Sequence, residues 1–260
     1  VGADFDAALL AGSALSADGL RVTNRPTPRA WQLFESDGHR TQIPRVAVDD
    51  WAAQLARTDE LLDRLAGLGV RAFHLLSRGH LADPALAARI AGMGVRLSLE
   101  PIIEEGMNQE QRDRVLACLP YVEIFSPGVA EARVLLGERS LAEALRTFAD
   151  RGPSIVALRQ GAAGSLIYHR ETHRMLRVPA VPASIVDLTG AGNAYCGGLL
   201  VGWVEHGRLE IAAAYAAISA ALTLEQVGPP RITPALTAMA EHQLAAVRTM
   251  LQEVDDVANT

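Results

Sequence analysis

The segment VDLTGAGNAYCGG, residues 186–198, combines the residue types from which proteins build a seat for a phosphate group. Gly190, Ala191 and Gly192 carry almost no side-chain bulk, so their backbone can approach a ligand closely and point successive N–H groups at it. A helix that begins at this turn adds the positive end of its dipole. The turn therefore suits a phosphoryl group or another oxyanion, although a strand-to-helix turn without a ligand would use the same glycines.

A dinucleotide-binding turn is the obvious alternative, and the sequence disfavours it. The pattern G-x-G-x-x-G fails because Tyr195 stands at the third glycine position. Asp187 and Thr189 also interrupt the segment where a dinucleotide-binding strand runs apolar into its turn.

The composition limits the classes of protein to which the chain can belong. It has 260 residues, of which 49% are hydrophobic, and a net charge of −6 without a basic cluster, so nucleic-acid binding has little support. All 24 basic residues are arginine, which excludes mechanisms that need a lysine. Cys118 and Cys196 have no nearby cysteine partner, and no apolar run is long enough to cross a membrane. We therefore expect reduced thiols and a cytoplasmic protein.

Strand-like and helix-like segments alternate along the chain, which indicates a mostly parallel sheet covered by helices on both faces. After a helix within residues 1–20, a hairpin with its turn at 36–38 and a helix at 51–68, we expect strands at 70–76, 94–100, 121–125, 154–160 and 164–169. The helices are expected at 83–93, 108–118, 129–136, 140–150, 191–205, 208–225 and 234–251. Ligands of such sheets gather beyond the carboxyl ends of the strands.

The glycine turn resembles the C-terminal signature of the PfkB carbohydrate kinase family, of the ribokinase-like superfamily. That signature reads D-x-x-G-A-G-D-x-F-x-x-G, against DLTGAGNAYCGG here. Three further segments are similar to family segments in the same order: VALRQGAAGSLIY to the nucleotide site, FSPGVAEARVLLG to the segment P-N-x-x-E, and TPRAWQLFESDGHRT to the lid strands. The resemblance implies a three-layer α/β/α fold of one domain, residues 1–260, with a small β lid at about 27–46.

Three departures from the family pattern bear on activity. The chain begins with VGADF, similar to the end of the family's N-terminal signature, so the first strands are expected to be missing. Asn193 replaces the aspartate that, in the family, accepts the proton of the acceptor hydroxyl, and an amide has no useful basicity. Gly128 replaces the asparagine of N-x-x-E, while Glu131 remains.

The resemblance also implies which residues form the site and what they bind. The cofactors are ATP and Mg²⁺, with Glu131 organising the ion through water and Glu100 near the phosphates. The anion hole is Gly190, Ala191 and Gly192, with Asn193 at the position of the general base. The remaining nucleotide-binding positions are Asp187, Thr189, Arg159, Gly161, Gly164 and Gly228. For Glu131 an ordinary first-turn glutamate favoured by the helix dipole, and for Arg159 a solvated strand end, stay open as structural alternatives.

The partners follow from the lid and from the substrates of the family. Arg29 and Trp31 are expected to meet a sugar or nucleoside, and the lid strands to pair two copies of the chain in a homodimer. His74 and His80 flank a short loop, but no third metal ligand shows at useful spacing, so we interpret them as structural.

Two functions stay open at this point. One is an ATP- and Mg²⁺-dependent kinase acting on a sugar or nucleoside hydroxyl, with activity reduced by Asn193, because loss of a general base removes about 10²–10⁴-fold in rate. The other is an inactive relative that keeps the fold to bind a nucleotide, a sugar or a protein.

Overall fold

The computed structural model describes residues 1–10, 16–17, 19–35, 40–55, 59–79, 82–103 and 106–254. Its residue contacts divide the chain into two compact units. The first contains residues 1–70 and 231–233, and the second contains residues 71–230 and 234–260. The expected hairpin lies in the first unit, and the glycine turn lies in the second.

A seven-stranded sheet forms the centre of the second unit, in the order β3-β4-β5-β6-β7-β8-β9. Its first four strands pair in parallel and the last three pairings are antiparallel, so five of the seven strands run in one direction. The strands are β3 (Ala72–Arg78), β4 (Arg96–Ile102), β5 (Ile124–Phe125), β6 (Ile155–Arg159), β7 (Ser165–His169), β8 (Arg174–Val178) and β9 (Gln252–Glu253). The first five match the expected strands, whereas β8 and β9 were not predicted.

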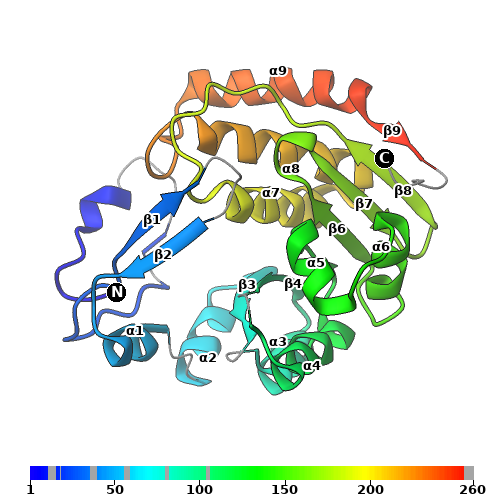
Figure 1. Cartoon of the computed structure of the whole chain (residues 1–260). Helices are drawn as coiled ribbons and strands as arrows, with labels where there is room; N and C mark the ends of the chain where they lie inside the picture. Colours follow the sequence, from blue (N-terminus) through cyan, green and yellow to red (C-terminus); the bar gives the residue numbers. More distant parts are fainter. Residues whose placement is uncertain are drawn as a thin grey trace. The chain divides into compact units, whose positions relative to one another are not determined.

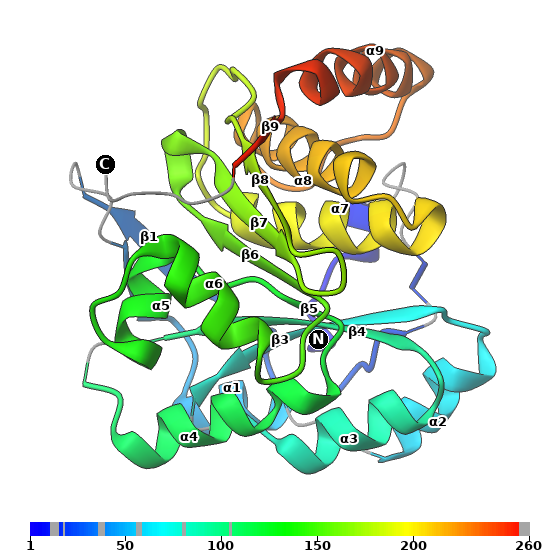
Figure 2. The same ribbon diagram turned by 90° about the vertical axis from the view of Figure 1, so that its right-hand side faces the viewer.

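Helices cover both faces of this sheet, as the sequence predicts (Figures 1 and 2). One face carries α7 (Ala191–His206) and α8 (Leu209–Leu224), and α9 (Pro234–Met250) packs on α8. On the other face lie α3 (Pro84–Gly92), α4 (Gln109–Ala117), α5 (Val129–Leu136) and α6 (Leu141–Ala149). The fold is therefore a three-layer α/β/α arrangement.

Alternation along the strands explains why the sheet needs two covers. In β6, Ile155 and Ala157 belong to the core formed with α7 and α8, and the intervening Val156 and Leu158 are equally buried. Phe125 of β5 meets Phe148 of α6 with ring centroids 4.9 Å apart. Strands of a parallel sheet that are buried on both faces read as continuous apolar runs, as these do.

Local capping signals fix the ends of several helices. Asp83 accepts hydrogen bonds from the amides of Ala85 and Leu86 at the start of α3, and Pro84 occupies the first turn. Capping boxes begin α4 at Asn108 and α6 at Ser140. These Asp, Asn and Ser caps satisfy amides that the first helical turn leaves without partners.

The first unit contains the hairpin and two helices. Strands β1 (Ala30–Phe34) and β2 (Arg40–Pro44) pair antiparallel within the expected range 27–46, and α1 (Val48–Leu55) and α2 (Asp59–Gly67) follow. The predicted turn at 36–38 lies outside the described residues. The helix expected within residues 1–20 is wrong for its described part: only a 3₁₀ turn, Ala7–Leu10, forms there.

No helix in the part of the chain that the structure describes is both long enough and apolar enough to cross a membrane.

Adjacent glycines of α7 allow a sharp test of how it packs on α8. A Cβ atom on Gly198 would lie 2.6 Å from the carbonyl oxygen of Tyr215, whereas one on Gly197 meets nothing within 4 Å. We expect Gly198→Ala to lower the free energy of unfolding by about 1–3 kcal/mol through overpacking. Gly197→Ala should leave it unchanged or raise it by up to about 1 kcal/mol through helix propensity. Urea unfolding followed by circular dichroism measures both, and equal effects would contradict this packing.

Candidate active site

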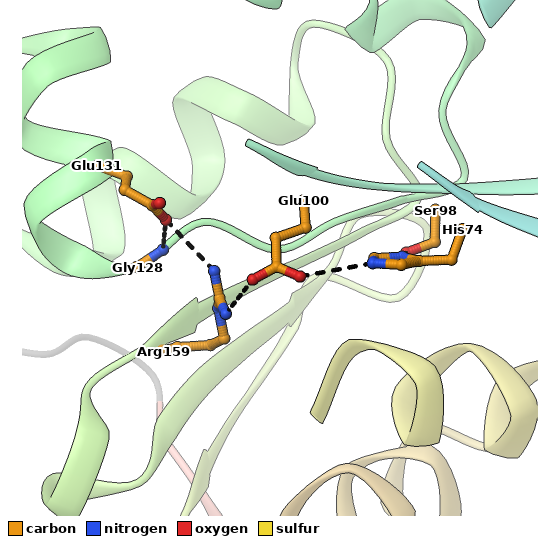
Figure 3. Close-up of polar contacts among 6 residues, drawn as sticks. All are labelled: His74, Ser98, Glu100, Gly128, Glu131 and Arg159. Carbon is orange, nitrogen blue, oxygen red and sulfur yellow. Dashed lines mark hydrogen bonds and ion pairs between the residues drawn. The ribbon is translucent and has the colours of Figure 1, made fainter. Parts of the chain in front are cut away.

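Three charged side chains converge at the carboxyl ends of the parallel strands (Figure 3). Arg159, the last residue of β6, places its Nη1 2.5 Å from Glu100 Oε1 of β4 and its Nη2 3.3 Å from Glu131 Oε2 of α5. The backbone holds the three together, since the Arg159 amide donates to Pro127 O over 3.0 Å and Gly128 forms a parallel bridge with Arg159. One guanidinium therefore joins two strands and a helix.

Because the three charged groups are shielded from solvent, the protonation of each carboxylate depends on the charges beside it. The Glu100 side chain is 7% exposed and that of Arg159 is 17% exposed. Burial acts to raise the pKa of Glu100, but His74 and Arg159 outweigh it and hold that pKa below its usual value. The pKa of Glu131 is raised by burial, despite the charge of Arg159 and the amide of Gly128. Glu100 is therefore ionised at neutral pH, while Glu131 holds its proton to a higher pH than an ordinary glutamate.

Glu131 also caps its own helix. Its Oε2 accepts a hydrogen bond from the Gly128 amide over 2.5 Å, where Gly128 is the residue that precedes α5. Glu131 is thus a first-turn glutamate that also caps the helix, which was not predicted from the sequence, and the same oxygen contacts Arg159. These two contacts fix the position of the Glu131 carboxylate, as the binding of a ligand would require.

The glycine turn lies against Arg159. Gly190 precedes α7 with φ +87°, a backbone conformation that favours glycine. A Cβ atom on Gly192 would clash with Arg159 Nη1 and lie 3.3 Å from Glu100 Oε1, so only glycine allows the guanidinium to lie this close to the helix. Thr189 and Gly190 are exposed.

The first turn of α7 has unused donors. Among the described residues, the amides of Gly192 and Asn193 make no hydrogen bond to a backbone or side-chain acceptor. The amide of Thr189 is satisfied by Asp187 Oδ1 over 2.9 Å, which shapes the turn. Positive charge therefore gathers at the start of α7, from two free amides, the helix dipole and the Arg159 guanidinium. This arrangement favours the binding of an anion.

Asn193 is the third residue of α7, and it is exposed. Its side chain makes no hydrogen bond to another described residue, so it is not needed to cap the helix. An amide can accept or donate a hydrogen bond there but cannot take up a proton at neutral pH.

The other predicted residues lie in three places. Gly161 and Gly164 bound the 3₁₀ turn between β6 and β7. Gly228, with φ +81°, lies in the loop after α8. In the first unit, the Arg29 guanidinium is ion-paired with Asp4 at 2.5 Å, and Trp31 is 58% exposed under the guanidinium of Arg45.

Sequence reasoning missed three neighbours of Glu100. His74 Nε2 lies 3.5 Å from Glu100 Oε2, and His74 Nδ1 lies 3.1 Å from Ser98 Oγ. Cys196, one turn along α7, is fully buried beside them, and burial raises the pKa of its thiol to about 12. The parallel register that pairs His74 with Ser98 brings the group together, and spacing along the chain carries no signal for it. His80 lies outside the described residues.

Comparisons with known proteins agree with this geometry. Residues 82–236 match the model of the pfkB family carbohydrate kinases. A cytidine kinase from Thermococcus kodakarensis is 26% identical, with 81% of this chain and 74% of the relative covered. A ribokinase from Haemophilus influenzae is 25% identical, with 76% of this chain and 60% of the relative covered.

Solved structures have the same fold. A putative ribokinase II from E. coli in complex with ATP and Mg²⁺ superposes with a TM-score of 0.66 at 22% identity, covering 86% of this chain and 73% of that protein. An Arabidopsis thaliana ribokinase complexed with ribose and ATP gives a TM-score of 0.60 at 22% identity, covering 86% of this chain and 70% of that protein.

The charge network predicts how stability depends on Arg159 and on pH. Arg159→Met keeps the length of the side chain but leaves the buried carboxylate of Glu100 and the half-buried one of Glu131 without their counter-ion, which should lower the free energy of unfolding by about 3 kcal/mol at neutral pH. The lowered pKa of Glu100 gives the wild type stability that is present above the unfolded-state pKa and lost as pH falls. In the variant both carboxylates take up protons at higher pH, so the difference from wild type should shrink toward about pH 5.

Arg174→Met is the matched control, because Arg174 also contacts two glutamates, Glu210 at 2.7 Å and Glu253 at 3.0 Å, but is twice as exposed, at 35%. It should cost about 1 kcal/mol or less. Urea unfolding at both pH values measures the two variants. A loss for Arg159→Met that is no larger than that of the control, or that grows toward acid pH, would contradict the network.

Proposed function

Since the chain belongs to the pfkB family of carbohydrate kinases, we propose that it binds Mg·ATP at the glycine turn and transfers a phosphoryl group to a hydroxyl of a sugar or nucleoside. The observation that carries the proposal is the pair of free amides at Gly192 and Asn193, beside the guanidinium of Arg159. Phosphoryl transfer depends mainly on positioning and on stabilising charge, and these groups supply both.

The charges of the site fit a nucleotide that carries a divalent cation. Glu100 and Glu131 bring two carboxylates to one guanidinium, so a bare polyphosphate would meet an excess of negative charge. Mg²⁺ prefers oxygen ligands and retains several waters, so the carboxylate of Glu131 fits it through water. When bound, Mg·ATP supplies the phosphoryl group and the ion neutralises part of its charge.

The residues of the chain have separate roles in this proposal. Glu100 holds Arg159 in place through Oε1, and Arg159 with the α7 amides stabilises the phosphoryl oxygens. The acceptor oxygen attacks the γ-phosphorus while the bond to the bridging oxygen of ADP breaks. Asn193 orients the hydroxyl by a hydrogen bond, and the proton passes to solvent or to an oxygen of the transferred group. Asp187 shapes the turn, and Thr189, Gly161, Gly164 and Gly228 line the nucleotide.

Other parts of the proposal rest on the resemblance to the family and on the composition of the chain. Arg29 and Trp31 contact the acceptor, the lid strands pair two copies of the chain, and the protein works in the cytoplasm. The four exposed apolar side chains of the hairpin support a role in contacts: Trp31, Leu33, Phe34 and Ile43.

One observation favours a second function, a non-catalytic protein that binds a nucleotide. Two polar positions of the family site have changed together, to Gly128 and Asn193, while the anion-binding turn and Glu131 are kept. Such a protein would bind Mg·ATP without transferring its phosphoryl group.

Restoring the carboxylate separates the two functions. If only the base is missing, Asn193→Asp should raise ADP release in the presence of the right sugar or nucleoside by about 10²–10⁴-fold. Asn193→Ala is the control and should stay at or below the wild-type rate. ADP release over a panel of sugars and nucleosides measures all three proteins. No gain for Asn193→Asp with any acceptor would favour the non-catalytic function.

Both functions require the anion-binding turn. Gly192→Ala should displace Arg159 from α7 and weaken binding of Mg·ATP by at least about tenfold, the loss expected for a charge-assisted hydrogen bond. Gly197→Ala, in the same helix and with open space around it, should bind like the wild type. Calorimetry with Mg·ATP measures the affinity. A wild-type protein that binds no Mg·ATP would refute both functions.

A further inference from the structure

The second oxygen of Glu100 faces His74, on the side of the carboxylate opposite the Arg159 contact. His74 of β3, Glu100 of β4 and Cys196 of α7 each offer one ligand atom, and the three atoms lie within 4.8 Å of one another. Glu100 and Cys196 are buried, and His74 is partly exposed, with 23% of its side chain accessible. A cluster of imidazole, carboxylate and thiol that is reachable through one member has the composition of a transition-metal site.

The facing atoms of this cluster lack normal partners. Glu100 Oε2 and His74 Nε2 are both buried without a hydrogen bond among the described residues, and they face each other at 3.5 Å, as Figure 3 shows. That separation exceeds the roughly 2.7–3.2 Å of an N–H···O hydrogen bond. Buried polar atoms are seldom left unsatisfied, so the gap calls for a cation or a proton between them.

The histidine is oriented as a metal ligand would be. Its Nδ1 lies 3.1 Å from Ser98 Oγ, a fully buried hydroxyl. When Nδ1 donates to this oxygen, the lone pair of Nε2 points at Glu100 Oε2. A hydrogen bond from the far ring nitrogen is the usual means by which proteins fix the tautomer and direction of a ligating histidine.

The separation of His74 Nε2 and Glu100 Oε2 matches two ligands of one tetrahedral zinc ion better than a hydrogen bond. With bonds of about 2.0–2.2 Å to nitrogen and oxygen, two such ligands of one ion lie about 3.3–3.5 Å apart. A sulfur bonded at about 2.3 Å lies about 3.6 Å from each of them, and since the three atoms already lie within 4.8 Å, the thiol has to approach by at most about 1.2 Å.

We propose that His74 Nε2, Glu100 Oε2 and Cys196 Sγ bind one zinc-type divalent ion, with the fourth ligand position left to solvent. On binding, the Cys196 thiol becomes a thiolate and its proton leaves to solvent. Arg159 holds the other oxygen of Glu100 at 2.5 Å and so orients the carboxylate toward the ion. Hard cations such as Mg²⁺ and Ca²⁺ avoid thiolate ligands, so this site is distinct from the one proposed for the nucleotide.

Co²⁺ is the probe, because a cobalt–thiolate bond gives a charge-transfer absorption that oxygen and imidazole ligands do not give. The full chain, freed of metal by a chelator, is incubated with Co²⁺ to equilibrium. We expect the thiolate band to saturate at one ion per chain, to be lost when Zn²⁺ is added, and to persist in excess Mg²⁺. Zn²⁺ should also raise the melting temperature of the wild type, because it binds the folded state.

Matched variants assign the band to its ligands. Cys196→Ser should abolish it, and Cys118→Ser, which changes the other buried cysteine at the end of α4, should leave it unchanged. His74→Gln should weaken Co²⁺ binding by at least tenfold, and it decides the matter if Cys196→Ser does not fold. A wild-type protein without a cobalt–thiolate band would overturn the proposal and leave a proton between His74 and Glu100. A band that survives Cys196→Ser, or an affinity for Co²⁺ that is unchanged in His74→Gln, would overturn it as well.

Discussion

The guanidinium of Arg159, held between two carboxylates at the carboxyl ends of the strands, is the constraint on which the site depends. One of these charges is buried and two are partly buried, and such charges are tolerated when they are paired, so Glu100, Glu131 and Arg159 must keep their places together. Because these residues come from β4, α5 and β6, the pairing fixes the spacing of three elements. It also dictates the residue at 192, since the guanidinium lies where a side chain on α7 would be. The lack of a side chain at Gly192 is thus required by the position of Arg159 as well as by any ligand.

The pairing of Arg159 with the two glutamates also determines the electrostatic environment at the start of α7. A guanidinium beside the positive end of a 16-residue helix is an unfavourable neighbour unless negative charge lies close by. Glu100 supplies that charge from within the protein, and two amides of the first turn are left for an outside anion. The network therefore leaves the turn ready to bind an anion while the guanidinium of Arg159 keeps its partners within the protein. A more positive site would bind anions without selectivity, and a more negative one would repel them.

Much of this fold could be predicted from local patterns in the sequence. The features that could not be predicted depend on contacts between residues far apart in the chain. Strands β3 to β7 and helices α7 to α9 follow from periodicity and turn residues, and the glycine turn is itself a local feature. The partners of Arg159 lie 59 and 28 residues away, so nothing near it in the sequence indicates them. The grouping of His74 with Cys196 needs both the strand register and the packing of α7. The expected first helix failed for the same reason: Gly2 pairs with Thr23, and the Val1 amino group donates to Arg21 O over 2.8 Å, so an extended pairing competes with local propensity.

The charges of the site also bear on the effect of having an amide, Asn193, in place of a carboxylate. In the proposed function, an aspartate there would place a third carboxylate beside the nucleotide, in addition to Glu100 and Glu131. Each added negative charge opposes the approach of phosphate. A carboxylate in this position therefore weakens binding of the nucleotide, and in exchange it raises the rate by accepting a proton. The amide removes that repulsion together with the proton acceptor, and it leaves the amides of α7 and the guanidinium as they were. Under the proposed kinase function, an amide at this position therefore eases the binding of phosphate and slows its transfer.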